Sequence, residues 1–327
     1  MFPFLVRRTL WAVALFLATT VITYLIFFII PADPAALACG KACTAKDVAR
    51  VRHSLGLDLP VWHQYLRFLG RLVLHGNLGT SFVNRQSVNQ IIGATAPVTA
   101  SLVFGGAVFW LALSIPVGIY SALKPRSLGD RAGMTFVLVG ISAHPVWIGL
   151  ILSFVFGYEL RNFPIHTPIV GYCEAISPPF GASCGGPVQW AYHLILPWCT
   201  FMVLFAALYV RLVRANVMET LSEDYVRTAR AKGAGEGRVM IQHVLRNSLL
   251  PVVTILGMDI GLALGGAIFT ERIFNLPGLG SRVITAYNQN DLPVILGVVV
   301  FATIAVIIFN LIVDLLYAVI DPRIRLA

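Results

Sequence analysis

Long apolar segments dominate this sequence and restrict the folds that it can adopt. Four of them carry no Asp, Glu, Lys or Arg, namely residues 9–32, 97–123, 133–158 and 188–210. Two more are each interrupted by one carboxylate, residues 248–270 by Asp259 and residues 292–320 by Asp314. About 20 apolar residues in an α-helix cross the hydrocarbon of a bilayer, and a helix satisfies its own backbone hydrogen bonds in lipid. The sequence therefore predicts an all-α, polytopic membrane protein with six transmembrane helices.

The composition excludes an ordinary soluble domain. Of the 327 residues, 57% are hydrophobic and 12% are charged, whereas about a quarter of the residues in soluble domains are charged. Arg7 and Arg8 precede the first apolar segment, as they would in a secretory signal. That segment is longer than the apolar region of a signal, and no small-residue cleavage site closes it. We therefore expect a membrane helix there.

The distribution of basic residues predicts the orientation of the chain. If the amino terminus is cytoplasmic, the inner segments hold Arg7, Arg8 and the basic cluster between residues 211 and 246, as the positive-inside bias requires. Both termini are then cytoplasmic and the protein is a multi-pass protein of the cell membrane. The outer loop of residues 32–96 is also basic and argues the other way, but it is about long enough to be exported regardless of charge. The net charge of +9 is thus a topology signal and predicts no nucleic-acid partner.

The cysteines fall mainly in the predicted outer loops. Cys39 and Cys43 lie in the first, Cys173 and Cys184 lie in the second, and Cys199 lies within an apolar segment. Two pairs in outer loops predict disulfides in an oxidising compartment, and four free thiols are the alternative. No metal site is expected, because neither pair has a histidine or carboxylate cluster nearby at ligand spacing.

The first outer loop is long enough to form structure of its own. Residues 44–55 read as a short amphipathic helix with Thr44 as N-cap and Asp47 at N3, a capping box in which Asp replaces Glu or Gln. Residues 60–74 read as a second helix opened by a proline. These helices form either a scoop over the outer mouth or an interfacial packing element. We divide the chain into residues 1–96 (first membrane helix and scoop loop), 97–320 (five-helix core with a cytoplasmic loop at 215–250) and 321–327 (cytoplasmic tail).

The polar segment of residues 219–251 separates the fourth and fifth apolar segments. Ser222 is the expected N-cap of a short helix, and Gly233, Ala234 and Gly235 break that helix. A second amphipathic helix begins at Glu236 and leads to the fifth span. Two short helices joined at a glycine corner predict a compact docking element for a partner. The alternative is a loop that lies on lipid headgroups.

The residues of this segment resemble those of a known family. Residues 224–233 read DYVRTARAKG and residues 243–251 read HVLRNSLLP. These strings are similar to the ATPase-coupling loop of type I ABC importer permeases of the dipeptide, oligopeptide and nickel branch, in the form found in the first (B-type) transmembrane subunit of dipeptide importers. Further stretches resemble the same family at residues 55–60, 76–81, 265–271, 277–280 and 317–325. One departure is Asn77, where many relatives carry Asp.

The resemblance implies a permease subunit that is not itself an enzyme. The sequence holds no G-x-x-x-x-G-K-[ST] phosphate loop, so no cofactor is expected in this chain. ATP and Mg would be bound by two partner ATPase subunits. The other implied partners are a second permease subunit in a heterodimer, an extracytoplasmic substrate-binding protein and membrane lipid. The implied cargo is a di- or oligopeptide, with nickel chelate, glutathione or haem as alternatives.

By the same resemblance, the coupling residues lie around the glycine corner. Tyr225, Val226 and Ala229 would form the buried contact with the ATPase, Arg227, Arg230 and Lys232 would be polar anchors, and Gly233 would form the corner. Asp224 and Ala234 complete the set of coupling residues.

Ionisable residues at membrane depth are candidates for the translocation path. Asp259 would contact the cationic amino end of a peptide or a bound cation, or else would form an interhelix hydrogen bond. His144 is a second candidate, although His144 and His193 are both also consistent with packing. If Asp259 were a proton relay, the chain would be an ion-driven secondary transporter. The absence of H-E-x-x-H and G-x-S-x-G argues against an intramembrane enzyme.

Overall fold

The computed structural model describes residues 2–28, 34–39, 44–55, 58–160, 167–175, 184–265 and 267–320. Within these residues the regular elements are helices, and the only β-pairing is two isolated bridges, Thr80 with Ser87 and Glu174 with Gly185. The all-α class predicted from the sequence is therefore confirmed. The predicted tail of residues 321–327 lies outside the described residues.

The apolar segments form four long helical spans and two bent pairs of helices. The long spans are Val6–Ile26, Val88–Leu123, Pro187–Leu221 and Leu292–Val313. The bent pairs are Leu128–Ser142 with Pro145–Glu159, at 108°, and Glu236–Ser248 with Leu250–Leu264, at 44°. The described residues thus provide six spans only if each bent pair is counted as one.

The 108° bend has a local cause in the His144-Pro145 step. A proline disfavours helical geometry in the preceding residue and has no N–H to donate. His144 is accordingly extended, with φ −73° and ψ 140°, and α6 (Leu128–Ser142) ends before it. Proline then opens α7 (Pro145–Leu152), which continues as the π-helix η1 (Ser153–Glu159). The apolar segment of residues 133–158, which the sequence predicts to be one span, therefore consists of two helices that meet at this bend.

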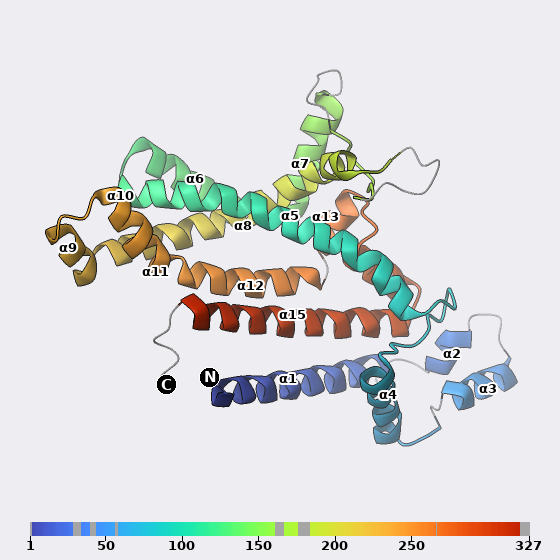
Figure 1. Cartoon of the computed structure of the whole chain (residues 1–327). Coiled ribbons are helices and arrows are strands. Elements are labelled where there is room, and N and C mark those ends of the chain that lie inside the picture. The colour runs from blue at the N-terminus through green and yellow to red at the C-terminus, as the bar shows by residue number, and fades with distance from the viewer. Residues whose placement is uncertain are drawn as a thin grey trace. The chain divides into compact units, whose positions relative to one another are not determined.

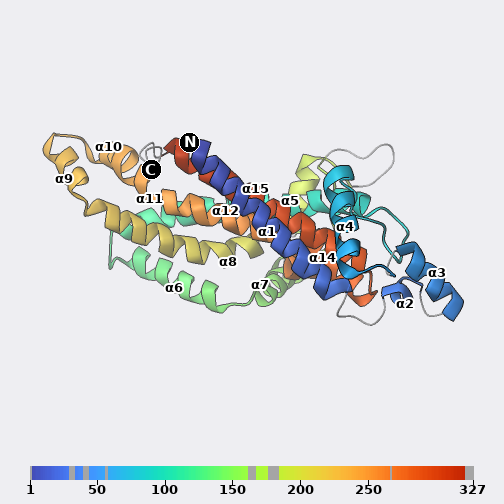
Figure 2. The same ribbon diagram turned by 90° about the horizontal axis from the view of Figure 1, so that it is seen from below.

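The chain divides into two compact units, and the first comprises Met1–Thr99, Gly261–Ile268 and Pro277–Ile308. Its helices include α1 (Phe2–Phe28), α2 (Pro34–Cys39), α3 (Ala45–Leu55), α4 (Val61–His75), α14 (Leu279–Asn288) and most of α15 (Leu292–Ile320). In Figures 1 and 2, α1 runs beside α15. Tyr24 of α1 packs in one buried cluster with Phe68 and Leu72 of α4 and Leu296 and Val300 of α15.

The predicted helices of the outer loop are present in the first unit. Thr44 and Asp47 form the reciprocal capping box, with Asp47 N donating to Thr44 Oγ1 at 3.4 Å and Thr44 N donating to Asp47 Oδ2 at 3.2 Å. The second helix, α4, follows Pro60 and ends at Gly76, whose φ is +59°. After α4, a turn is anchored to the residue before α15, because the Ser81 hydroxyl and Phe82 N both donate to the buried Asp291 carboxylate.

The second unit comprises Ala100–Ile260, Phe269–Leu276 and Phe309–Ala327. Its central helix is α8 (Pro187–Leu221), which packs against α6 and against residues 100–123 of α5 (Val88–Leu123). The Trp110 ring of α5 stacks on Phe205 of α8 with centroids 4.6 Å apart. Gly118 lets the two helices approach closely, since a Cβ there would lie 2.7 Å from the Val213 side chain.

Candidate functional site

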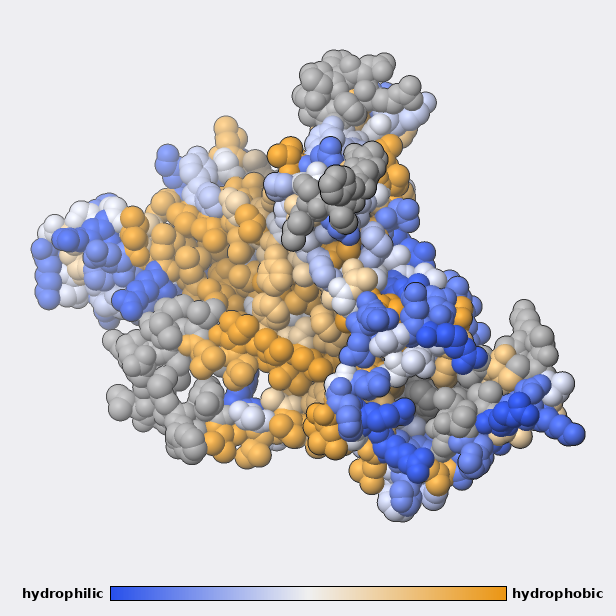
Figure 3. Space-filling model, turned by 45° about the vertical axis from the view of Figure 1, so that its right-hand side comes forward, coloured by the Kyte–Doolittle hydropathy of each residue, from blue (hydrophilic) through white to orange (hydrophobic). Residues whose placement is uncertain are grey.

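The predicted coupling segment forms a helical element at one end of α8 and α12 (Leu250–Leu264) (Figure 1). The element, α8 and the part of α12 up to Ile260 belong to the second unit. It consists of α9 (Asp224–Ala231), α10 (Glu236–Arg238), the π-helix η2 (Val239–Leu245) and α11 (Arg246–Ser248). Figure 3 shows hydrophilic side chains gathered over this end, beside hydrophobic helix surface. We call residues 222–248 the coupling element.

Gly233 forms the corner of the coupling element. Its φ is +84°, in the region that glycine adopts at no steric cost. Gly233 N donates to Arg230 O at 2.9 Å, and Ala234 N donates to Ala229 O at 3.2 Å. These two bonds are the Schellman pattern that ends a helix. A substituted Cβ at Gly233 would meet no atom within 4 Å, so the constraint comes from backbone geometry and not from crowding.

The start of α9 differs from the prediction. The N-cap is Glu223 and not Ser222, and its side chain makes no capping hydrogen bond. The Ser222 hydroxyl instead donates to Glu219 O at 2.7 Å, at the end of α8. Ser222 therefore serves the preceding helix, because its own backbone lies in the right-handed helical region (φ −85°, ψ −9°) and not in the extended region that an N-cap requires.

The interior of the coupling element is formed by valines. Val226 of α9 and Val239 and Val244 of η2 are fully buried within the chain. The prediction that Val226 contributes a contact surface for a partner is therefore corrected: its side chain is already covered by this chain. Val226 supports the shape of the element, and the residues available for contact lie around it.

Tyr225 lies on the surface of the element and is held in place from two directions. Its side chain is exposed, at 40%. The hydroxyl accepts a hydrogen bond from Asn247 Nδ2 at 2.7 Å and donates to His243 O at 3.4 Å. Because these partners lie on η2 and α11, Tyr225 ties α9 to the second half of the element.

Charged side chains surround the corner. Arg230 donates to both carboxylate oxygens of Glu236, at 2.8 and 3.1 Å, and this pair spans Gly233. Arg227 lies 3.6 Å from Asp224 in a looser, exposed pair. Lys232 is exposed, whereas Ala229 and Ala234 are half-buried. The predicted coupling residues other than Val226 thus lie at or near the surface of one small element.

The coupling element is also tied to the end of α8. Asn216 Nδ2 of α8 donates to Ser248 O of α11 at 3.3 Å. Since α11 leads into α12, this bond joins the helices that enter and leave the element. A force on the element would therefore act on α8 and α12 together.

Asp259 of α12 makes an interhelix hydrogen bond. The Tyr209 hydroxyl of α8 donates to Asp259 Oδ2 at 2.8 Å. Tyr209 is fully buried and Asp259 is half-buried. One carboxylate oxygen of Asp259 is thus occupied by a buried donor of this chain.

His144 is a helix cap at the bend between α6 and α7. Its Nδ1 accepts from Val146 N at 3.3 Å, and its ring lies edge-on to Phe269 with centroids 5.1 Å apart. No hydrogen bond joins His144 to Asp259 among the described residues. The structure therefore does not bring the two predicted path residues into one polar contact.

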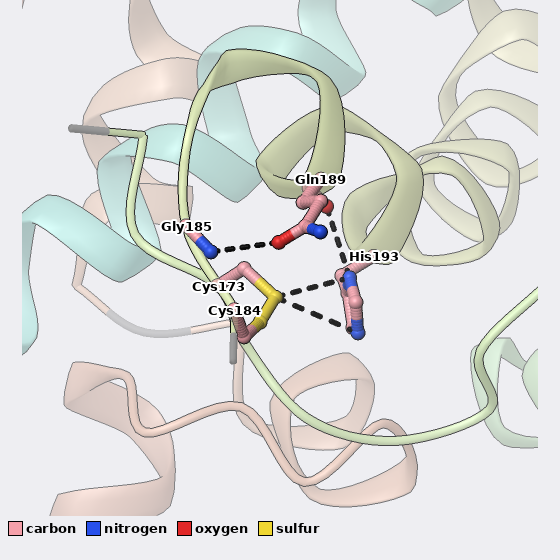
Figure 4. The surroundings of a disulfide bond; sticks show 5 residues. All are labelled: Cys173, Cys184, Gly185, Gln189 and His193. Atoms are coloured by element: carbon pink, nitrogen blue, oxygen red, sulfur yellow. Dashed lines mark hydrogen bonds between the residues drawn. A yellow bond between two sulfur atoms is a disulfide. The ribbon is translucent and has the colours of Figure 1, made fainter. Parts of the chain in front are cut away.

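Cys173 and Cys184 form a disulfide with Cα atoms 5.4 Å apart. Figure 4 shows His193 of α8 beside this disulfide, with Nδ1 3.2 Å from Cys173 Sγ. This proximity could not be predicted from the sequence, because His193 lies 20 residues beyond Cys173 and the chain turns back between them. Cys39 is described, whereas Cys43 lies outside the described residues.

The chain matches two family models over nearly its whole length. Residues 114–326 match the family described as "Binding-protein-dependent transport system inner membrane component". Residues 1–103 match the corresponding model for the N-terminal part of such membrane components.

Three relatives show the extent of the similarity. The dipeptide transport system permease protein DppB of Escherichia coli (strain K12) is 35% identical, and the match covers 99% of each chain. The oligopeptide transport system permease protein AppB of Bacillus subtilis (strain 168) is 37% identical over 99% of this chain and 100% of its own. The glutathione transport system permease protein GsiC of Pectobacterium atrosepticum is 37% identical over 99% of each chain. This chain is a permease subunit of an ABC importer and belongs to the family of binding-protein-dependent transport system inner membrane components.

Proposed function

We propose that this permease moves di- or oligopeptides from an extracytoplasmic binding protein into the cytoplasm. The names of the relatives support this cargo class, since they are transporters of dipeptides, oligopeptides and glutathione, which is itself a short peptide derivative. Nickel chelate and haem are the alternative cargoes. The transport step is alternating access within a heterodimer of this chain and a second permease subunit, embedded in membrane lipid.

The energy for transport comes from two separate ATPase subunits that bind ATP and Mg. The observation that carries this proposal is the construction of the coupling element. A Schellman corner at Gly233, a valine interior and the ties through Tyr225 and Asn216 make it rigid. A rigid polar element joined to α8 and α12 can transmit movement of a partner to the membrane helices. The partner would contact its exposed side chains, including Tyr225 and Arg227.

We further propose that Asp259 lies on the translocation path. A peptide carries a cationic amino group, and the Asp259 oxygen that does not receive the Tyr209 hydrogen bond can accept from it. His144 at the bend between α6 and α7 would lie on the same path, where its ring supports the bend rather than binding cargo.

Uptake by the assembled transporter tests the coupling role. The chain is reconstituted in liposomes with its cognate second permease subunit, ATPase subunits and binding protein, and ATP-dependent uptake of a labelled dipeptide is measured. Gly233→Trp and Ala229→Asp are expected to abolish most uptake while membrane insertion is unchanged. Gly235→Ala is the matched control, because Gly235 has φ −65° and no atom within 4 Å of a substituted Cβ. Normal uptake in both Gly233→Trp and Ala229→Asp would refute the coupling role.

Ion-driven transport through Asp259 is the other mechanism expected from the sequence, and membership of the importer family argues against it. The same liposomes separate the two mechanisms. Uptake that needs internal ATP and survives a proton uncoupler supports the importer. Uptake that needs a proton gradient and no ATP supports the secondary transporter.

A further inference from the structure

The disulfide between Cys173 and Cys184 lies against an imidazole. Cys173 is 1% exposed, and its sulfur lies 3.2 Å from His193 Nδ1 and 3.6 Å from Nε2. Figure 4 shows the ring directed at the sulfur from the first turns of α8. In the described part of the chain this is the one group of three His, Cys, Asp or Glu residues whose ligand atoms all lie within 4.8 Å of one another.

The surrounding chain is held together by bonds other than the disulfide. Gly186 N donates to Glu174 O at 3.0 Å, and this bond belongs to the bridge between Glu174 and Gly185, the residues that follow the two cysteines. Gly185 N donates to Gln189 Oε1 at 2.7 Å and so fastens the second cysteine's neighbour to α8. Reduction of the disulfide therefore leaves both thiols beside His193, because the backbone contacts that position them remain.

The hydrogen bond of His193 to the backbone also fixes the tautomer that a metal ligand requires. Its Nδ1 lies 2.9 Å from Gln189 O, and since a carbonyl oxygen only accepts, Nδ1 carries the proton in this bond. Nε2, which lies 3.6 Å from Cys173 Sγ, is then the unprotonated nitrogen, and its lone pair is the one that a metal can use. A metal-bound histidine in proteins commonly has this arrangement, with its other N–H donated to a backbone carbonyl.

We propose that the reduced form of this site binds zinc through Cys173, Cys184 and His193. Two thiolates and one imidazole with a water molecule in the fourth position are a ligand set that zinc accepts. Zinc–sulfur bonds of about 2.3 Å in a tetrahedron separate the ligand atoms by roughly 3.5–3.8 Å. The two sulfurs need to move apart by only a short distance once the bond between them is broken.

The zinc-bound state forms from the disulfide in two steps. A dithiol reductant attacks the disulfide by thiol–disulfide exchange, is itself oxidised to a disulfide, and leaves two protein thiols. Zinc then binds the two thiolates and His193 Nε2, and the two thiol protons are released. The site therefore has two mutually exclusive states, a disulfide without metal and a dithiolate with zinc, and this property is independent of the proposed cargo.

Metal titration of the full chain tests the proposal. The background variant carries Cys39→Ser, Cys43→Ser and Cys199→Ser, which leaves the two thiols of the site as the only ones. The detergent-solubilised protein is reduced with a phosphine, desalted without oxygen and titrated with Co²⁺ and then Zn²⁺. The reduced protein is expected to bind one zinc ion per chain, with a thiolate-to-cobalt absorption band and tetrahedral cobalt bands, while the oxidised protein binds none.

Two variants identify the histidine ligand. His193→Gln is expected to weaken zinc binding at least about tenfold, whereas His144→Gln, on another element, leaves the affinity unchanged. Alkylation of the two thiols followed by mass spectrometry provides a second readout, in which zinc slows the reaction in the His193-containing protein. The proposal is overturned if the reduced protein binds no zinc, if His193→Gln binds it equally well, or if zinc leaves the alkylation rate unchanged.

Discussion

The Tyr209 hydroxyl donates a 2.8 Å hydrogen bond to the Asp259 carboxylate and so joins α8 to α12 at membrane depth. These are the helices that enter and leave the coupling element. In lipid a carboxylate without a partner is costly, and a bond of this kind supplies one partner inside the protein. The pair therefore connects the region that a partner would move with the region that cargo would cross.

The Tyr209→Phe variant tests whether the hydrogen bond between Tyr209 and Asp259 stabilises the fold. The ring remains, but Asp259 loses its buried donor, which costs about 1–3 kcal/mol for an unsatisfied buried polar group. We expect a lower unfolding midpoint in detergent. Tyr158→Phe is the control, because Tyr158 is 64% exposed and stacks on Phe154 through its ring. Equal midpoints for the two variants would show that the hydrogen bond does not stabilise the fold.

The Asp259→Asn variant tests whether the Asp259 carboxylate recognises the amino group of the cargo. Asparagine can still accept from Tyr209 but carries no charge, so the interaction with a cationic amino group weakens. We expect the KM for a dipeptide with a free amino terminus to rise about tenfold, the factor that corresponds to ~1.4 kcal/mol, with little change for an N-acetylated dipeptide. Assembly with the ATPase subunits stays intact. An equal change for both peptides would remove Asp259 from cargo recognition.

A charge exchange tests whether the ion pair across the corner matters for coupling. Arg230 and Glu236 are 39% and 73% exposed, so their pair is worth about 0.2–1 kcal/mol to stability. We expect Arg230→Glu and Glu236→Arg each to reduce peptide-stimulated ATP hydrolysis by the assembled transporter, and the double exchange to restore part of it. Restoration would assign the effect to the pair. If the double variant is as impaired as the worse single variant, the individual charges contact the partner instead.

The sequence was sufficient to predict the helical class and most helix positions, because these depend on local patterns. The apolar segments, the capping box at Thr44 and Asp47 and the glycine break at Gly233 are each recorded within a few residues. The structure agrees with the local signal at Gly233, whose positive φ is the backbone geometry that a glycine break indicates.

Features that depend on tertiary contacts could not be predicted in the same way. The sequence predicts that Val226 is buried against the ATPase, whereas the structure buries it within the element, where η2 packs against α9. His193 and Cys173 are unrelated in sequence and meet because the loop before α8 returns to that helix. The bend at His144 does not depend on tertiary contacts in this way. The proline that follows His144 is a local signal from which the bend could have been predicted.

The ion pair between Asp130 of α6 and Arg214 of α8 provides another test. Arg214 Nε and an Nη nitrogen donate to the two Asp130 oxygens at 2.8 and 3.1 Å, and Arg126 N donates to Oδ2 at 2.8 Å. Asp130→Ala removes a mostly buried partner, so we expect a loss of about 2 kcal/mol, seen as a lower unfolding midpoint. Arg211→Ala is the control, because Arg211 is an exposed arginine of α8, the helix that carries Arg214. Equal midpoints for Asp130→Ala and the unmodified protein would contradict the prediction.

The capping box of α3 predicts that the stability of this helix depends on pH. The Thr44 hydroxyl, followed by the Thr44 backbone N–H, holds the pKa of Asp47 below its ordinary value of 3.8. A carboxylate with a lowered pKa in the folded state stabilises that state above its ordinary pKa, and the contribution is lost as the pH falls through the lowered value. Amide hydrogen exchange in α3 is therefore expected to be faster in Thr44→Ala than in the unmodified protein near neutral pH. Below the lowered pKa of Asp47 the carboxylate is protonated, and this difference in exchange rate shrinks.

Asp58→Asn, which changes an exposed acid beyond the end of α3, is the control and should leave the exchange in α3 unchanged. A difference for Thr44→Ala that stays constant across the acid range would show that the Asp47 charge has no part in the cap.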